Sequence, residues 1–194
     1  MLEIKNKKQS IEIMKKLNLN YFPLQVFDKK DLDGIKNFIS NNPSKEYVVR
    51  TTDDVKGMFF YAESYAKIKN LLVFFKKNIT LSVSYRPLQK HIVLVGDIKV
   101  EKTEDEVLVN LTASSNTEID NRKVYDEAEF NFKQEDVKSD NLWSINGFAE
   151  ILEYIIDNNL FDLVVEFTVY DIPVGRNNQN VLISEIRGQY WRWK

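Results

Sequence analysis

The sequence contains no cysteine and only one histidine, and these two shortages exclude several kinds of site. Without cysteine, the chain has no disulfide, no thiolate nucleophile and no Cys-ligated zinc or iron–sulfur centre. With His91 as the single imidazole, a histidine-rich metal site is also excluded. Any metal ion would therefore be held by oxygen ligands, which favour magnesium, manganese or calcium.

The chain also has little net charge and no long apolar run. Its 27 Lys and Arg against 29 Asp and Glu leave a formal charge of −2, which predicts no general attraction to nucleic acid or to an anionic membrane. No run of about 18 apolar residues is present, so we expect no membrane span. The lysines near the N-terminus are not followed by an apolar segment, which argues against a secretory signal. These features favour a cytoplasmic protein without a membrane partner and disfavour a nucleic-acid partner.

The length and the apolar content are sufficient for a substantial core. A chain of 194 residues with 43% hydrophobic residues fits one globular unit, 1–194. A division into an N-terminal α+β lobe, 1–78, and a C-terminal sheet lobe, 79–194, is the alternative that we keep open.

Apolar residues at helical spacing predict four helices. We expect Ser10 to cap the first and Asp28 to cap the second, since both residue types accept hydrogen bonds from the first helical turn. Ser64 is expected to start the third helix, and the fourth follows Gly147. The expected ranges are 10–17, 28–40, 64–78 and 147–157.

Runs of alternating or β-branched residues predict several strands. A short connection between the fifth and sixth of them predicts a hairpin. Because most helices are separated from a run of adjacent strands, we expect an α+β fold with a mostly antiparallel sheet and helices packed on one face. Residues 114–140 are polar and remain unassigned. The expected strands are 24–27, 47–51, 58–61, 79–85, 91–101, 106–113, 163–170 and 181–190.

The last two expected strands carry charged residues among apolar ones. If they pair antiparallel in a suitable register, Glu166, Glu185 and Arg187 form one charged cluster. With strict alternation along the final strand, one face would carry the side chains of Val181, Ile183, Glu185 and Arg187.

This pattern resembles a divergent ATP-grasp domain. The strand that ends in Arg50 is similar to one whose basic residue contacts ATP phosphates in that family. The helix 147–157, which leads into the strand with Glu166, is similar to the segment that supplies an acidic metal ligand. The run from Glu185 to Arg187 is similar to the final motif. The resemblance implies that Glu166 and Glu185 hold Mg²⁺, and that Arg50 and Arg187 bind ATP.

The resemblance implies two ATP-grasp-like lobes and a nucleotide-binding cleft. If the protein is active, it implies an ATP-dependent ligase that joins a carboxylate to a nucleophile through an acyl phosphate. The loop 51–57 departs from the family, because it has one glycine and two aspartates that would oppose phosphate charge. The final motif also lacks a clear asparagine. A degenerate or repurposed relative fits these departures better than a standard ligase.

A different reading needs no ligand. Glu166, Glu185 and Arg187 could form an ion pair on a half-buried sheet face, because an arginine between two carboxylates satisfies such charges. The chain would then be a non-enzymatic protein-interaction or structural domain. Its contact surface could be the acidic segment 126–140, or the aromatic tail 191–194 could join copies into a homo-oligomer. The sequence leaves both readings open.

Overall fold

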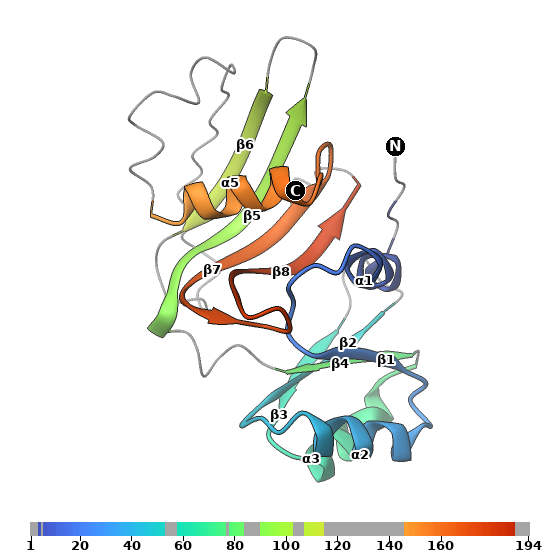
Figure 1. Ribbon diagram of the computed structural model, residues 1–194. Coiled ribbons are helices and arrows are strands. Elements are labelled where there is room, and N and C mark those ends of the chain that lie inside the picture. Colours follow the sequence, from blue (N-terminus) through green and yellow to red (C-terminus); the bar gives the residue numbers. More distant parts are fainter. Residues whose placement is uncertain are drawn as a thin grey trace.

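The structure is a computed structural model in which two lobes are each built on a four-stranded antiparallel sheet (Figure 1). It describes residues 4, 6–52, 58–76, 78–83, 90–102, 107–114 and 146–188. The expected α+β class is confirmed, with two sheets in place of one. The helices are α1 (Lys7–Lys16), α2 (Leu32–Asn41), α3 (Tyr65–Leu71), the 3₁₀ turn η1 (Leu72–Phe74) and α5 (Phe148–Asp157). The strands are β1 (Leu24–Phe27), β2 (Tyr47–Thr51), β3 (Phe59–Ala62), β4 (Ile79–Val83), β5 (Ile92–Lys102), β6 (Val107–Ser114), β7 (Val164–Val174) and β8 (Gln179–Arg187).

The first sheet has the strand order β1-β4-β2-β3, with α2 and α3 packed on one face (Figure 1). Ile35 of α2, Ile68 of α3, and Val49 and Leu81 of the sheet are completely buried in the core between these layers. The other face of the sheet is turned toward the second lobe. It supplies one wall of the cleft described below.

The second sheet has the order β6-β5-β7-β8, and α5 crosses one of its faces (Figure 1). Helix α1 packs along the outer edge of β8, where the Oγ of Ser10 accepts a hydrogen bond from the backbone N–H of Ile186 at 2.8 Å. Ile11 and Met14 of α1 enter the same core as Ile151 of α5. Helix α1 therefore covers a strand edge that would otherwise expose unpaired backbone groups.

The sheets divide the chain differently from a boundary at residue 78. Strand β4, 79–83, is an inner strand of the first sheet, between β1 and β2. Helix α1 comes first in the chain but packs on the second sheet. The physical reason is long-range strand pairing and core packing, which sequence order does not reveal.

A β-bulge interrupts the regular alternation of β8. Glu166 lies opposite Glu185, but the next residue, Phe167, lies opposite Ile183, so Ser184 is an extra residue in β8. Ile183 consequently faces the core under α5, whereas Glu185 faces the other side of the sheet. The expectation that Val181 and Ile183 share a face with Glu185 and Arg187 is therefore wrong.

Two of the expected helix caps are shifted. The side chain of Asn6, not Ser10, accepts the hydrogen bond that caps α1. Asp31, not Asp28, caps α2. Ser64 caps α3 as expected. Asn, Asp and Ser are similarly good caps, so a sequence with several of them near a boundary does not identify which one is used.

Asn20, which lies between α1 and β1, makes hydrogen bonds to β7, β8 and the turn that joins them. Its buried side-chain amide donates hydrogen bonds to the carbonyls of Val181 at 2.7 Å and Val174 at 3.0 Å. Its Oδ1 accepts from the backbone N–H of Asn177 at 2.9 Å. Gly175 in this turn has a φ of 73°, and a Cβ there would lie 2.4 Å from the Asn20 Oδ1. The side chain of Asn20 therefore pairs the backbone groups of the turn, and the missing side chain of Gly175 leaves room for it.

We expect Asn20→Ala to lower the free energy of unfolding by about 3 kcal/mol, because it leaves several buried backbone groups without partners. Urea unfolding followed by circular dichroism would measure the change. Asn37→Ala is the matched control, since Asn37 is exposed on α2 and its replacement should change stability by less than about 0.5 kcal/mol. Equal stability of the two variants would contradict the structural role of Asn20.

Three expectations fall on residues that the structure does not describe. The segment 114–140 lies outside the described residues except for Ser114, which ends β6. The loop 53–57 and the tail 191–194 also lie outside them. Within the described ranges, no helix is long and apolar enough to cross a membrane.

Candidate functional site

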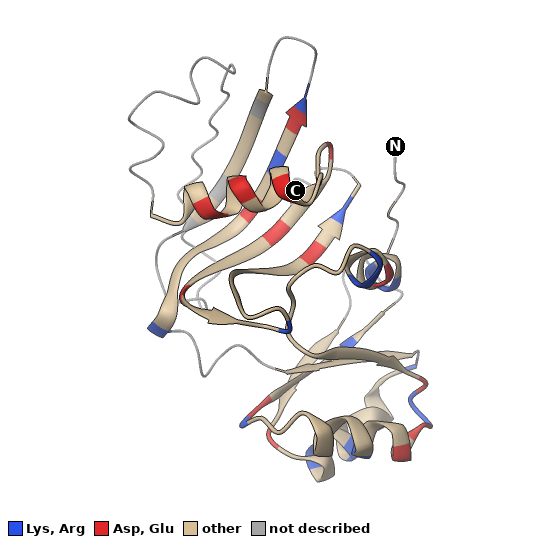
Figure 2. Ribbon diagram, in the orientation of Figure 1, with Lys and Arg blue, Asp and Glu red and all other residues tan. Residues whose placement is uncertain are grey.

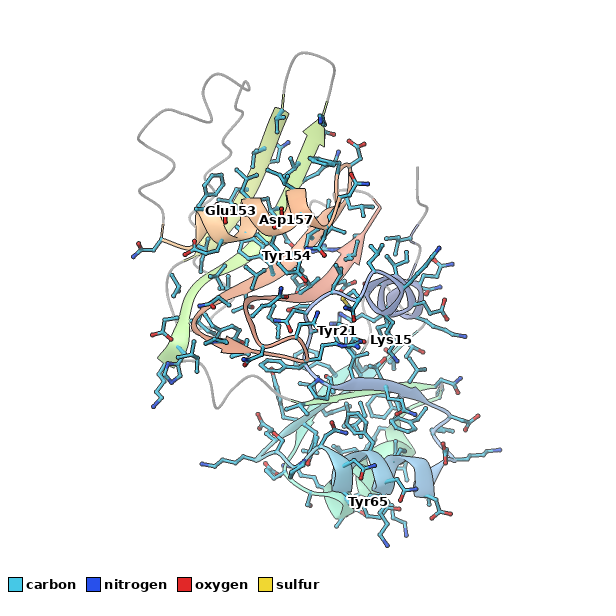
Figure 3. All side chains as sticks on the ribbon, in the orientation of Figure 1. Lys15, Tyr21, Tyr65, Glu153, Tyr154 and Asp157 are labelled. Atoms are coloured by element: carbon cyan, nitrogen blue, oxygen red, sulfur yellow. The ribbon has the colours of Figure 1, made fainter. Side chains whose placement is uncertain are left out.

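A cleft of about 170 Å³ lies where the two lobes meet. One wall is the open face of the first sheet, and the other is formed by residues of α1, β7 and β8. Aromatic side chains line part of it, including Tyr21, which lies at the junction of the lobes (Figure 3). Lys7, Arg50 and Glu166 also line it, so the cleft combines apolar surface with charges of both signs. Ligand sites commonly combine these features.

Three carboxylates form a row across the second sheet. Asp97 of β5 lies opposite Glu166 of β7, which lies opposite Glu185 of β8. Figure 2 shows the acidic positions of β7 and β8 side by side on these neighbouring strands. Like charges directly opposite one another destabilise a sheet unless cations compensate them.

Cations from three elements compensate this row. The guanidinium of Arg187 lies 2.5 Å from Asp97 and 3.7 Å from Glu166. The Nζ of Lys7 donates to Glu185 at 2.6 Å. Arg50 reaches from the first lobe to within 4.0 Å of the same carboxylate. All four residues predicted from the sequence, Arg50, Glu166, Glu185 and Arg187, are thus brought together.

Glu185 is the centre of this charge network. Its burial acts to raise its pKa, but Lys7, then Arg50 and Arg187, outweigh burial and hold the pKa below its usual range. The carboxylate is therefore ionised at neutral pH. The carboxylates Asp97, Glu166 and Glu185 in turn raise the pKa of Arg187 despite its burial.

Asp97 behaves in the opposite way. Burial, followed by repulsion from Glu166, raises the pKa of Asp97 to about 6. The attraction of Arg187 acts against this rise but is smaller, although the two side chains are hydrogen-bonded. Asp97 is therefore a carboxyl group that takes up a proton only slightly below neutral pH.

Sequence reasoning missed Lys7 and Asp97. Lys7 was overlooked because the first helix was expected to begin at Ser10, which placed Lys7 outside it. Asp97 is a polar residue within an apolar strand, and it lies on the same face of β5 as Val95 and Lys99. This interruption was a usable signal, but the sequence does not reveal that β5 pairs with β7.

The raised pKa of Asp97 predicts a pH-dependent stability. A pKa above the unfolded value favours folding at low pH, and this contribution is lost as pH rises through about 6. Asp97→Asn removes the titration, so the variant should gain stability relative to wild type between pH 4 and 7.5, by at most about 3 kcal/mol. Thermal unfolding of both proteins across this range would measure it. A constant difference at all pH values would contradict the assignment.

The residues fit a divalent cation only together with further oxygen ligands. Glu166 and Glu185 supply the carboxylates that Mg²⁺ prefers. Within the part of the chain that the structure describes, however, no group of three or more acidic or histidine side chains comes close enough to hold a metal ion. Mg²⁺ commonly combines one or two protein carboxylates with phosphate oxygens and water, and these two glutamates match that mode.

Comparison with known proteins gives matches to solved structures only. No protein-family profile matches the sequence, and no curated protein does. N5-carboxyaminoimidazole synthase from Aspergillus clavatus, in complex with ADP and 5-aminoimidazole ribonucleotide, has a TM-score of 0.58 at 14% identity, over 97% of this chain and 45% of that one. D-Alanine-D-alanine ligase from Helicobacter pylori has a TM-score of 0.58 at 13% identity, over 94% of this chain and 53% of that one.

The fold is ATP-grasp-like. A third match, N5-carboxyaminoimidazole synthetase from Staphylococcus aureus, covers 96% of this chain with a TM-score of 0.57 at 13% identity. The resemblance inferred from the sequence is thus confirmed at the level of the fold. The ATP-grasp-like chain spans about half the length of the structures that it matches, 44% in this third case.

Proposed function

We propose that this ATP-grasp-like chain binds ATP together with Mg²⁺ in the cleft between its lobes. The main support for the proposal is that Arg50 of the first lobe lies 4.0 Å from Glu185 of the second. Glu166 and Arg187 lie beside them in the same network. These are the four residues to which the sequence resemblance gives metal and phosphate roles.

Each charged group has a defined part in the proposal. Glu166 and Glu185 would hold Mg²⁺, which would supply positive charge against the phosphates. Arg50 and Arg187 contact phosphate, since guanidinium groups match its oxygens in bidentate geometry. The ADP in the Aspergillus clavatus structure supports the choice of nucleotide, because that protein shares this fold.

Charge balance makes the two ligands depend on each other. Three cations, Lys7, Arg50 and Arg187, face the three carboxylates of the row. Mg²⁺ alone would add positive charge beside Lys7, and ATP alone would add negative charge beside Glu185; both are unfavourable. With both ligands bound, Glu185 would have a cation other than Lys7 and Arg50 beside it, and these two side chains would be free to bind phosphate.

We therefore expect ATP with Mg²⁺ to raise the melting temperature, and either ligand alone to raise it much less. Ligand at ten times its Kd stabilises by about 1.4 kcal/mol, which corresponds to a shift of about 3–5 °C for a chain of this size. Differential scanning fluorimetry with ATP, Mg²⁺ and both would measure it. No shift at millimolar ATP–Mg²⁺ would overturn the proposal.

Variants at the two glutamates test the metal role separately. Glu185→Gln should abolish most of the shift, and so should Glu166→Gln, whose more exposed side chain makes unfolding of the variant a smaller concern. Glu12→Gln is the matched control on the exposed face of α1 and should respond like wild type. A full shift in both glutamate variants would remove these residues from the metal site while leaving nucleotide binding in place.

A further inference from the structure

The hydroxyl of Thr80 is a buried polar group that faces the cleft. Thr80 in β4 is 4% exposed and lines the cleft. Its Oγ1 has no hydrogen-bond partner in the described part of the chain. Buried hydroxyls are normally paired, because an unpaired one costs stability. A ligand in the cleft would supply the missing partner.

The neighbours of Thr80 indicate the chemistry of that partner. Thr80 lies directly opposite Arg50 on β2 and opposite Val26 on β1. Side chains directly opposite on one face of a sheet have Cβ atoms about 5 Å apart. The side chain of Val26 has no polar atom, so the polar neighbour opposite Thr80 is the guanidinium of Arg50. A ligand group bound by Arg50 is therefore within reach of the hydroxyl.

We propose that Thr80 donates a hydrogen bond to a phosphoryl oxygen of the nucleotide that Arg50 contacts, and so contributes to selection of a phosphorylated ligand. The inference rests on the proposed function. Arg50 attracts anionic oxygens, and an anionic oxygen accepts hydrogen bonds, so the hydroxyl acts as the donor. Thr80 would thereby extend the phosphate contacts from β2 to β4, next to it in the sheet.

Thr51 provides a closely matched control. It is also 4% exposed, and its Oγ1 likewise has no partner among the described residues. Its opposite residue on β4 is Ile79, which lies in the core beneath α2 and α3. Among the described residues, Thr80 lines the cleft and Thr51 does not. Comparing the two threonines therefore separates the effect of the cleft from the general effect of removing a buried hydroxyl.

Isothermal titration calorimetry with Mg²⁺–ATP on the full chain would test the inference. Thr80→Val keeps the side-chain shape and removes the hydroxyl, and we expect its Kd to rise about tenfold, equivalent to about 1.4 kcal/mol. Thr80→Ser keeps the hydroxyl and should remain within about threefold of wild type. Thr51→Val should bind like wild type. Melting temperatures without ligand would verify that all three variants fold.

The outcomes separate this inference from the proposed function. An unchanged Kd in Thr80→Val, or an equal loss in Thr80→Ser, overturns the role of the hydroxyl while nucleotide binding stands. Absence of binding by wild type overturns the proposed function and this inference with it.

Competition by inorganic tripolyphosphate tests whether Thr80 contacts a phosphoryl oxygen and not another part of the nucleotide. The inhibition constant of tripolyphosphate should be higher for Thr80→Val than for wild type. If tripolyphosphate does not displace ATP from wild type, or if its inhibition constant is unchanged in Thr80→Val, the phosphoryl assignment is overturned.

Discussion

The extra residue at Ser184 decides on which face of the second sheet each side chain of β8 lies. Because the strand period is two, Glu185 would lie on the same side as Ile183 in a regular strand, beneath α5 and inside the apolar core. The bulge reverses this alternation within one residue. Ile183 and Ile186 then remain in the core, whereas Glu185 and Arg187 meet the charged residues of β7 and β5. Bulges are frequent next to active sites for this reason.

The negative charge of Glu185 is a further constraint, because the bulge places this side chain on the sheet face opposite to the apolar core. A half-buried carboxylate needs partners, and Lys7 and Arg50 supply them from two different elements. Lys7 is in place because α1 is fixed on β8 through Ser10 and through its apolar face. The ion pairs therefore join the first helix, the first sheet and the last strand, and they connect Lys7 and Arg50 on opposite walls of the cleft.

Part of this site was predictable. Glu166, Glu185 and Arg187 lie close in sequence on two strands joined by a short turn, so their proximity follows from antiparallel pairing. Arg50 was predicted through a family resemblance, because no local pattern connects it to the C-terminal strands. Lys7 and Asp97 were missed. Lys7 is separated from Glu185 by 178 positions, and contacts over such separations depend on how complete elements pack.

Local patterns in the chain are sufficient to predict the α+β class, most helices and strands, and the kind of chemistry that oxygen ligands and guanidinium groups allow. Those properties follow from side-chain periodicity and composition, which act over a few residues. Four features became visible only in three dimensions: the membership of β4 in the first sheet, the bulge at Ser184, the cation beside Glu185 and the Thr80 hydroxyl, which has no partner among the described residues. These depend on which distant surfaces come together, since burial and electrostatic pairing are set by neighbours in space.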